Sequence, residues 1–453
     1  MRNSFIITFL VSAAFGPMTM AADGQTGSRP NILLLMTDQH AATAMSCVGN
    51  RDLRTPALDQ LAAEGVRFDR AYVTQPLCMP CRSSLQTGRY PHEIGTISNG
   101  RPIQGEFPLI GNLVNDAGYE SAYIGKWHVG TSLENAGYAE SIQPKRDRDK
   151  SLLARDFLMR DREKPFFLTV SFLNPHNVCQ LARGQELPDG PIGQPPVLFN
   201  DLPSLPDNFD VPGNEPTAIR EVQAKSNSHY PTKHWDELKW RQYLWGYYRL
   251  VEKVDAEIAT VIDALDKSGQ RDNTVIIFVS DHGEGVAMHH WNQKQILYEQ
   301  AVRVPFLISW RGKTKPRVTD MLASVSLDIP ATILSFAGAE KPESMRGISL
   351  KEFALSGSVT KERDFVVAET MFARGARSLG LVGRMIRTQK YKYCVYDVGQ
   401  MREQLFDMDA DPGETNNLVV DASFSDELNR HRALITDWAR QTSDLAFPYV
   451  KAN

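Results

Sequence analysis

The chain has 453 residues and a net charge of −4 at neutral pH, and its 42% hydrophobic and 23% charged residues are ordinary for a globular protein. This length allows a large core, with one big domain and a smaller one. The charge balance excludes the overall basic bias of nucleic-acid-binding proteins, so we expect no nucleic-acid partner. The cysteines are too few, and odd in number, for a disulfide framework; they are Cys47, Cys78, Cys81, Cys179 and Cys394.

Residues 1–22 have the pattern of a secretory signal peptide. Arg2 supplies the positive start, residues 5–15 are apolar, and residues 19–21 offer small side chains for cleavage. The alternative is an uncleaved membrane anchor, but the apolar run is too short to span a bilayer. We therefore expect a secreted or periplasmic protein whose mature form has no membrane span.

A nearly continuous apolar run at residues 31–37 predicts a buried parallel strand. Asp38 and Gln39 follow directly. Ligands bind at the carboxyl ends of strands in open α/β sheets, so both residues are candidates for a functional site. The alternative for Asp38 is a helix cap.

The segment 76–89 contains the pattern Cys-x-Pro-x-Arg, formed by Cys78, Pro80 and Arg82. Proline fixes its own φ angle, which places Cys78 on a turn. If a helix starts near Pro80, Arg82 returns over Cys78 and can hold anionic oxygens. The free N–H groups at the start of that helix also attract an anion.

Two other interpretations of Cys78 and Cys81 are open. The pair forms a Cys-x-x-Cys motif, which occurs in structural zinc sites, but the sequence has no second such pair. A thioredoxin-like redox pair is the other interpretation. The residues further along the chain favour a catalytic role for Cys78 over both.

Three later predicted strands also end in polar residues. The strands are residues 121–125, 166–173 and 273–280. The polar residues that follow them are Lys126, His128, His176, Asp281 and His282. Lysine and histidine two positions apart on an extended chain point to the same side. The alternatives are exposed lysines, packed histidines and a helix-capping aspartate.

Asp38, Gln39 and Asp281 offer oxygen ligands, which favours a hard divalent cation such as calcium. His282 is less typical of a calcium site and suits manganese or zinc better. The sequence therefore predicts a metal site formed where two neighbouring strands end.

Three further segments complete the chain. Residues 180–231 are rich in proline, glycine and aspartate, and we expect them to form part of the pocket rim. Residues 235–267 contain a long helix with a core-facing apolar stripe. The loop after the 273–280 strand carries His289, His290 and Lys294.

Beyond residue 345 the pattern changes to short β strands, at residues 365–369, 379–388 and 391–396, and a closing helix at 425–442. We divide the chain into a signal peptide (1–22), a catalytic domain (28–345) and a C-terminal α+β subdomain (346–453).

The Cys-x-Pro-x-Arg motif and the following Thr87-Gly88-Arg89 resemble the signature of type I sulfatases. The similarity extends in blocks over nearly the whole mature chain. In that family the motif cysteine is oxidised to formylglycine (3-oxoalanine), and one hydroxyl of its hydrate attacks sulfur. The resemblance implies an alkaline-phosphatase-like α/β fold, with a mostly parallel sheet between helices and a smaller C-terminal domain.

The resemblance also implies a role for each site residue. Cys78 is the nucleophile and, with Asp38, Gln39, Asp281 and His282, matches the metal site, which usually holds calcium, with Mn²⁺ or Mg²⁺ as alternatives. Arg82 and Lys126 match residues that hold the formylglycine hydrate and the sulfate oxygens. His128 matches the residue near the second hydroxyl, and His176 and Lys294 match residues near the leaving oxygen. Many members have Asp in place of Gln39 and Asn in place of His282.

These matches predict a sulfuric ester hydrolase that removes sulfate from a sulfated carbohydrate, such as a glycosaminoglycan fragment. Its partner is a maturing enzyme, either formylglycine-generating or of the anaerobic type. One alternative is a formylglycine-dependent phosphonate monoester or phosphodiester hydrolase. The other is a non-catalytic protein that binds sulfated glycans, which would need a degraded nucleophile or metal site.

Overall fold

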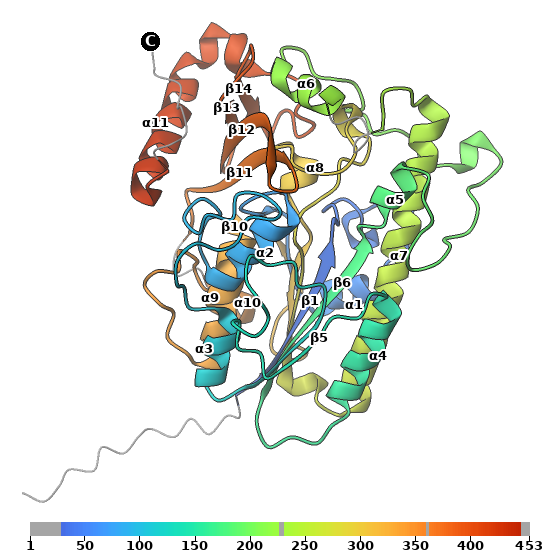
Figure 1. The fold of residues 1–453 in the computed structure, drawn as a ribbon, viewed down its shortest axis with the longest axis vertical. Helices are drawn as coiled ribbons and strands as arrows, with labels where there is room; N and C mark the ends of the chain where they lie inside the picture. The colour runs from blue at the N-terminus through green and yellow to red at the C-terminus, as the bar shows by residue number, and fades with distance from the viewer. Residues whose placement is uncertain (1–28, 226–230, 359–361, 445–453) are drawn as a thin grey trace, which may run out of the picture.

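The computed structural model describes residues 29–225, 231–358 and 362–444. The predicted signal peptide lies outside these ranges. Within them, no helix combines the length and the apolar character that crossing a bilayer requires. Figure 1 shows the described chain as a sheet between layers of helices, with a second sheet above it.

The larger sheet is mixed and mostly parallel. Its adjacent strands β4, β6, β1 and β7 run parallel, whereas β8 is antiparallel to both β7 and β2. Among the described residues the strand order is β5 (Glu140–Ile142), β4 (Glu120–Gly125), β6 (Phe166–Pro175), β1 (Asn31–Asp38), β7 (Thr274–Ser280), β8 (Phe306–Ser309), β2 (Gly65–Phe68) and β9 (Arg317–Thr319). This arrangement confirms the predicted fold class.

Helices cover both faces of this sheet. Side chains alternate along a strand, so Leu33 and Leu35 of β1 face one layer and Ile32 and Leu34 face the other. The first layer contains α1 (Pro56–Glu64), α4 (Asp147–Leu158) and α7 (Glu237–Lys267). The second contains α2 (Cys78–Thr87), α3 (Ile110–Asp116), α9 (Val325–Ala337) and α10 (Lys351–Ser356). Burial on both faces explains why the middle of β1, residues 32–36, is apolar throughout.

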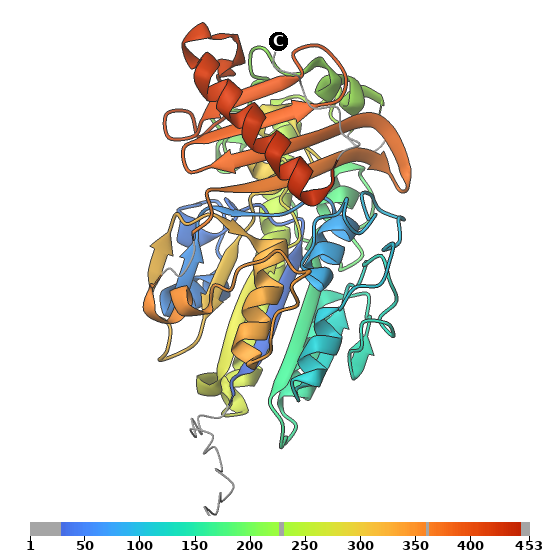
Figure 2. The ribbon, with the colours of Figure 1, turned by 90° about the vertical axis from the view of Figure 1, so that its left-hand side faces the viewer.

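The C-terminal sheet is antiparallel, and α11 (Ser425–Thr442) lies across its outer face (Figure 2). Ile435 and Trp438 of α11 pack on Val367 and Ile386 of the sheet. The inner face packs on the chain around α8 (Glu299–Val302). Its strands, within the described chain, are β11 (Phe365–Arg374), β12 (Arg377–Thr388), β13 (Tyr391–Tyr396) and β14 (Glu403–Asp407). The domain division at residue 345 stays a proposal.

Helix α2 begins at Cys78, two residues before the predicted start near Pro80. Proline is tolerated in a first helical turn because its missing N–H would have no intrahelical partner there. The helix is buried along most of its length, and Cys81 and Leu85 contribute to the core beside the larger sheet. The chain enters it from β3 (Ala71–Tyr72), which pairs with β10 (Ala323–Ser324).

The segment 180–231 is less irregular than its composition indicates. It contains the end of α5 (Val178–Ala182) and the whole of α6 (Thr217–Lys225). Residues 226–230 lie outside the described chain. The rest of the segment is mostly loop, as expected.

Candidate active site

The carboxyl ends of four adjacent parallel strands meet at one edge of the larger sheet. Lys126 follows β4, His176 follows β6, Asp38 ends β1 and Asp281 follows β7. The main chain ties these ends together, because the Lys126 N–H donates to the Ser171 carbonyl at 2.9 Å. The structure therefore brings together the polar residues that the sequence places after separate strands.

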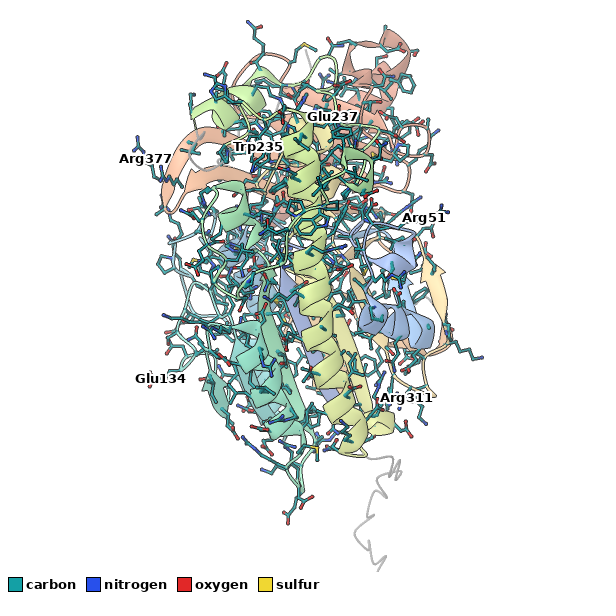
Figure 3. All side chains as sticks on the ribbon, turned by 90° about the vertical axis from the view of Figure 1, so that its right-hand side faces the viewer. Arg51, Glu134, Trp235, Glu237, Arg311 and Arg377 are labelled. Atoms are coloured by element: carbon teal, nitrogen blue, oxygen red, sulfur yellow. The ribbon has the colours of Figure 1, made fainter. Side chains whose placement is uncertain are left out.

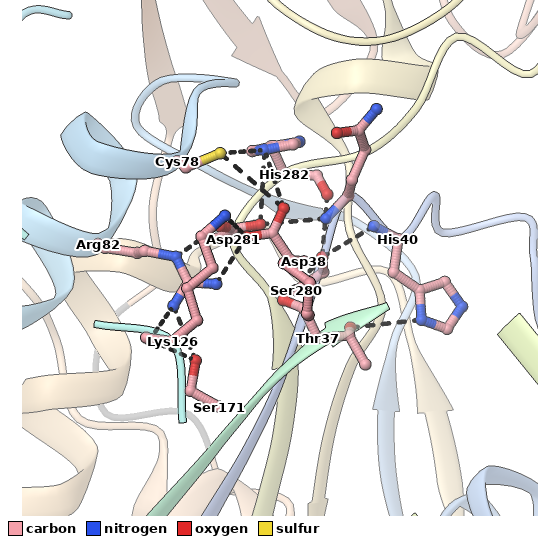
Figure 4. Close-up of polar contacts among 12 residues, drawn as sticks. Thr37, Asp38, His40, Cys78, Arg82, Lys126, Ser171, Ser280, Asp281 and His282 are labelled. Atoms are coloured by element: carbon pink, nitrogen blue, oxygen red, sulfur yellow. Dashed lines mark hydrogen bonds and ion pairs between the residues drawn. The ribbon is translucent and has the colours of Figure 1, made fainter. Parts of the chain in front are cut away.

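Cys78 faces this edge from the first turn of α2 (Figure 4). Its Sγ atom lies 3.0 Å from Lys294 Nζ and 3.2 Å from His282 Nε2. The Asp38 carboxylate is 3.9 Å away. The thiol is 1% exposed, so it sits at the bottom of the site rather than on the surface.

Arg82 is a buried clamp on two carboxylates. Its Nε donates to Asp281 Oδ2 at 2.7 Å, and Nη2 donates to Asp38 Oδ2 at 2.9 Å. Nη1 donates to the Lys126 carbonyl at 2.9 Å and to Ser171 Oγ at 2.8 Å. The guanidinium thus fixes the orientation of Asp38 and Asp281. These four hydrogen bonds all go to protein oxygens, so Arg82 positions the two carboxylates.

Two lysines bring further positive charge to the site. Lys126 Nζ donates to Asp38 Oδ2 at 2.5 Å. Lys294 Nζ contacts Gln39 Oε1 at 3.1 Å and His282 Nε2 at 3.3 Å, besides the Cys78 thiol. Burial lowers the pKa of Lys294, but Cys78, Cys179 and Asp38 raise it above its usual range. Lys294 is therefore a cation beside the Cys78 thiol.

These cations change the acidity of their neighbours. Burial alone raises the pKa of the Cys78 thiol, but Lys126, Lys294 and His282 hold it well below its usual value. Burial and the same two lysines lower the pKa of His176 to about 4, so its imidazole is neutral at pH 7. Burial also opposes ionisation of Asp38, yet the surrounding cations hold its pKa well below its ordinary range.

The donor set fits a divalent cation. Ligand atoms of Asp38, Cys78, Asp281 and His282 all lie within 4.8 Å of one another. The His282 Nδ1–H donates to the Gly283 carbonyl at 2.9 Å, which leaves the Nε2 lone pair facing the cluster. Carboxylate oxygens with one imidazole nitrogen suit a hard or borderline metal ion.

Glu284 orients the remaining predicted ligand, Gln39. The Gln39 amide donates from Nε2 to Glu284 Oε2 at 2.6 Å, so its Oε1 points toward Lys294. Glu284 also accepts a hydrogen bond from the Tyr243 hydroxyl at 2.5 Å. Gln39 itself adopts a left-handed backbone with φ of 68°, which is uncommon outside glycine and occurs at functional sites.

The two remaining predicted histidines lie at the rim of this cluster and are half-buried. His128 lies near enough to Cys78 to help lower the pKa of its thiol, and the Nδ1 atom of His128 has no hydrogen-bond partner within the described residues. His176 lies near enough to Cys78 for the thiol to influence its pKa. His289, in contrast, bonds Gly413 and Gln300 through its two ring nitrogens, so it serves packing.

Sequence reasoning missed three supporting residues. Ser171 lies inside β6 and links Arg82 to the Lys126 carbonyl, and no pattern distinguishes it from other strand residues. Tyr243 lies on the stripe side of α7 and reaches Glu284. Glu284 itself had a signal, because it follows Asp281 and His282 at a strand end.

Two family profiles match the chain. The profile described as sulfatase matches residues 30–339, which is more than half of the chain. The profile described as N-sulphoglucosamine sulphohydrolase, C-terminal, matches residues 287–440. Together the two matches include every predicted site residue.

Similar proteins cover nearly the whole chain. A Delta 4,5-hexuronate-2-O-sulfatase from Bacteroides thetaiotaomicron is 31% identical over 449 residues, covering 93% of this chain and 91% of the relative. An N-acetylglucosamine-6-O-sulfatase from the same organism is 28% identical over 494 residues, covering 92% and 87%. The solved structure of a 2-O GAG sulfatase superposes with a TM-score of 0.80 at 30% identity, covering 92% and 93%.

Proposed function

The chain belongs to the sulfatase family, and we propose that this sulfuric ester hydrolase removes sulfate from a sulfated carbohydrate. The observation that carries the proposal is the position of Cys78, which lies between a cation, Lys294, and a cluster of metal-ligand atoms. The hexuronate and N-acetylglucosamine sulfatases among its relatives support a sugar substrate.

We propose that Cys78 is converted to formylglycine, whose hydrate supplies the nucleophilic hydroxyl. Asp38, Gln39, Asp281 and His282 would hold a calcium ion, with manganese or magnesium as alternatives. When bound, such a cation neutralises charge on the sulfate oxygens and lowers the pKa of a coordinated hydroxyl. Lys126 and Lys294 add fixed positive charge at the same place.

The chain also supplies the proton transfers. The leaving alkoxide needs a proton, and the Lys294 ammonium, which lies against the side chain of residue 78, is placed to donate it. His176 is neutral before an anion enters, and a bound sulfate ester would offset the two lysines and raise its pKa. His128, whose Nδ1 is unpaired within the described chain, is suited to accept the proton from the second hydroxyl when sulfate is released.

Burial of the nucleophile indicates when maturation takes place. Cys78 is 1% exposed, and most of α2 is buried with it. A second enzyme cannot reach the thiol in this folded structure, so we propose that the maturing enzyme acts before α2 packs. We also propose export from the cytoplasm through the predicted signal peptide.

Peptide mass spectrometry tests the nucleophile directly. The peptide spanning residues 71–82 is analysed from protein made in its own host, and conversion of thiol to aldehyde lowers its mass by about 18 Da, a change distinct from ordinary cysteine oxidation. Active protein with an unmodified Cys78 would refute the mechanism. Rates on aryl sulfate and aryl phosphonate esters, measured on the same preparation, decide between sulfatase and phosphonate hydrolase activity.

A further inference from the structure

The far end of the β11–β12 hairpin packs on a loop that contacts Met79, the residue after Cys78. On one side, Asn99 Oδ1 accepts a hydrogen bond from the Met79 backbone N–H at 3.1 Å, directly after Cys78. The next residue, Gly100, packs on the hairpin tip, since a Cβ added to it would lie 3.5 Å from Ala376 Cβ. In Figure 2 the hairpin end lies above this loop.

A second connection joins the hairpin to the same site. Gln295 follows the catalytic candidate Lys294 in the chain. Its carbonyl accepts a hydrogen bond from the Thr370 hydroxyl at 2.6 Å, and its Oε1 accepts one from the Ala373 N–H at 2.7 Å. Strand β11 is therefore anchored one residue away from a group that contacts the Cys78 thiol.

The two loops that meet here carry only positive charge. Residues 96–105 and 372–381 contain three arginines and no aspartate or glutamate. All three arginines are exposed. Figure 3 shows Arg377 projecting outward from the hairpin, on the opposite side of that view from Arg51. We name Arg101, Arg374 and Arg377 the arginine rim.

One member of the arginine rim, Arg101, lines a cavity of about 390 Å³. Its lining includes Arg101, Thr370 and Met371, so it lies between the segment that joins α2 to α3 and the C-terminal sheet. The lining also includes Gln75, His92, Arg384 and three acidic residues, Glu369, Asp397 and Asp444. Gln75 is buried, and its Nε2 donates to the Ile97 carbonyl at 2.8 Å. Its Oε1 is buried and has no hydrogen-bond partner within the described residues.

We propose that the arginine rim binds a second anionic group of the saccharide, while the sugar unit that carries this group enters the adjoining cavity. The inference rests on the proposed function, because it takes the sulfate under attack to be at Cys78. Guanidinium groups bind carboxylate and sulfate through paired hydrogen bonds, so the second group is either a uronate carboxylate or another sulfate. Polar and apolar residues around a cavity of this size suit a sugar ring.

Paired substrates test the proposal on the matured enzyme. One pair is a monosulfated disaccharide with a uronate and its carboxyl-reduced counterpart. The other pair is a disulfated hexosamine and its monosulfated form. For each pair, the preference for the more anionic member is the ratio of the two kcat/KM values. We expect Arg374→Gln/Arg377→Gln, and separately Arg101→Gln, to reduce this preference about tenfold in at least one pair, mainly through KM.

The substrate pair whose kcat/KM preference falls in the arginine-rim variants identifies the second group as carboxylate or sulfate. Arg51→Gln is the matched control, since Arg51 is an exposed arginine far from the arginine rim, and it should leave both preferences unchanged. Thermal unfolding of each variant confirms that it is folded. Preferences equal to those of the wild type in both pairs would overturn the proposal.

Calorimetric binding to Cys78→Ala protein, which cannot mature, separates this inference from the proposed function. One outcome supports the inference and refutes the proposed function. In that outcome the enzyme cleaves none of these esters, yet Cys78→Ala protein binds the more anionic saccharides. The arginine-rim replacements then lower this affinity about tenfold. If the replacements leave the affinity for the more anionic saccharides unchanged, this assay also refutes the proposal that the arginine rim binds an anionic group.

Discussion

Arg82 and Asp281 form a buried ion pair, with Nε donating to Oδ2 at 2.7 Å across 199 residues of sequence. The same guanidinium bonds Asp38, so a single side chain of α2 holds carboxylates from two neighbouring strands. Helix α2 therefore carries Cys78 and also positions two of the predicted metal ligands, Asp38 and Asp281.

Replacement of Arg82 by lysine should separate positioning from charge. Lysine keeps the positive charge, but its ammonium group cannot reproduce the four hydrogen bonds that the planar Arg82 guanidinium donates. We expect metal affinity to fall roughly 10–100-fold and kcat to fall with it, because the carboxylates lose their orientation. Metal titration and steady-state kinetics measure both, with Arg311→Lys at a surface ion pair as control. Wild-type metal affinity in Arg82→Lys would contradict the role.

Removal of the metal should abolish activity and reduce stability. A ligand that binds only the folded state, at a free concentration 100 times its Kd, stabilises that state by about 2.7 kcal/mol. Dialysis against a chelator should therefore lower the melting temperature as well as the rate, and calcium, manganese or magnesium should restore both. Asp38→Asn protein should respond weakly to added metal. Undiminished activity in excess chelator would refute a metal-dependent mechanism.

A histidine–glutamate pair, His92 and Glu369, predicts a pH dependence of stability. His92 Nδ1 lies 2.7 Å from Glu369 Oε1 and joins the chain after α2 to the C-terminal sheet. Burial lowers the pKa of His92, but Glu369 and Asp444 outweigh it and raise the pKa to about 9. Because the folded-state pKa lies above the unfolded value, the stabilisation is complete below about pH 6.5 and is lost as the pH rises through about 9.

Urea unfolding of the wild type and of His92→Gln at pH 6, 7.5 and 9.5 measures how much the His92–Glu369 pair contributes to the free energy of unfolding. The wild type should be more stable by about 2–3 kcal/mol at pH 6, and the difference should largely vanish at pH 9.5. His234→Gln, at an exposed histidine, is the control. A difference that stays constant with pH would show that His92 acts through packing alone, for example against Trp438.

Much of the site follows from one property of the sequence. Apolar runs such as residues 31–37 end in polar side chains, and parallel strands carry their carboxyl ends to one edge. That reasoning correctly indicated that Asp38, Lys126, His176 and Asp281 would converge. The motif around Cys78 indicated that this residue lies at the start of a helix that faces the same edge, although the helix begins two residues earlier than predicted.

The remaining features depend on tertiary contacts that no local pattern encodes. The orientation of Gln39 is decided by Glu284, which lies 245 residues away. Ser171 is one of three polar residues in β6, with Thr169 and Asn174, and only the folded structure shows that it contacts Arg82. The meeting of Gly100 with Ala376 likewise joins two domains of the predicted division. Helix α4 has a mixed, charged sequence and gave no clear signal.

Gly125, at the end of β4, should be intolerant of any side chain. Its φ is 115°, in the region that favours glycine, and an added Cβ would lie 2.0 Å from the Ser171 carbonyl oxygen. That oxygen is backbone and also accepts the Lys126 N–H, so it cannot move without disturbing the pairing of β4 with β6.

Gly125→Ala should therefore lower the free energy of unfolding by more than backbone strain alone would. Gly184 has a φ of 64° and open space around it, so Gly184→Ala isolates the strain term, about 1–2 kcal/mol. We expect Gly125→Ala to lose at least about 3 kcal/mol by urea unfolding, because the clash adds to that strain. It should also reduce kcat, since Lys126 follows directly. Equal losses in the two variants would mean that β4 and β6 adjust without cost, and that the position of Lys126 does not depend on this close approach.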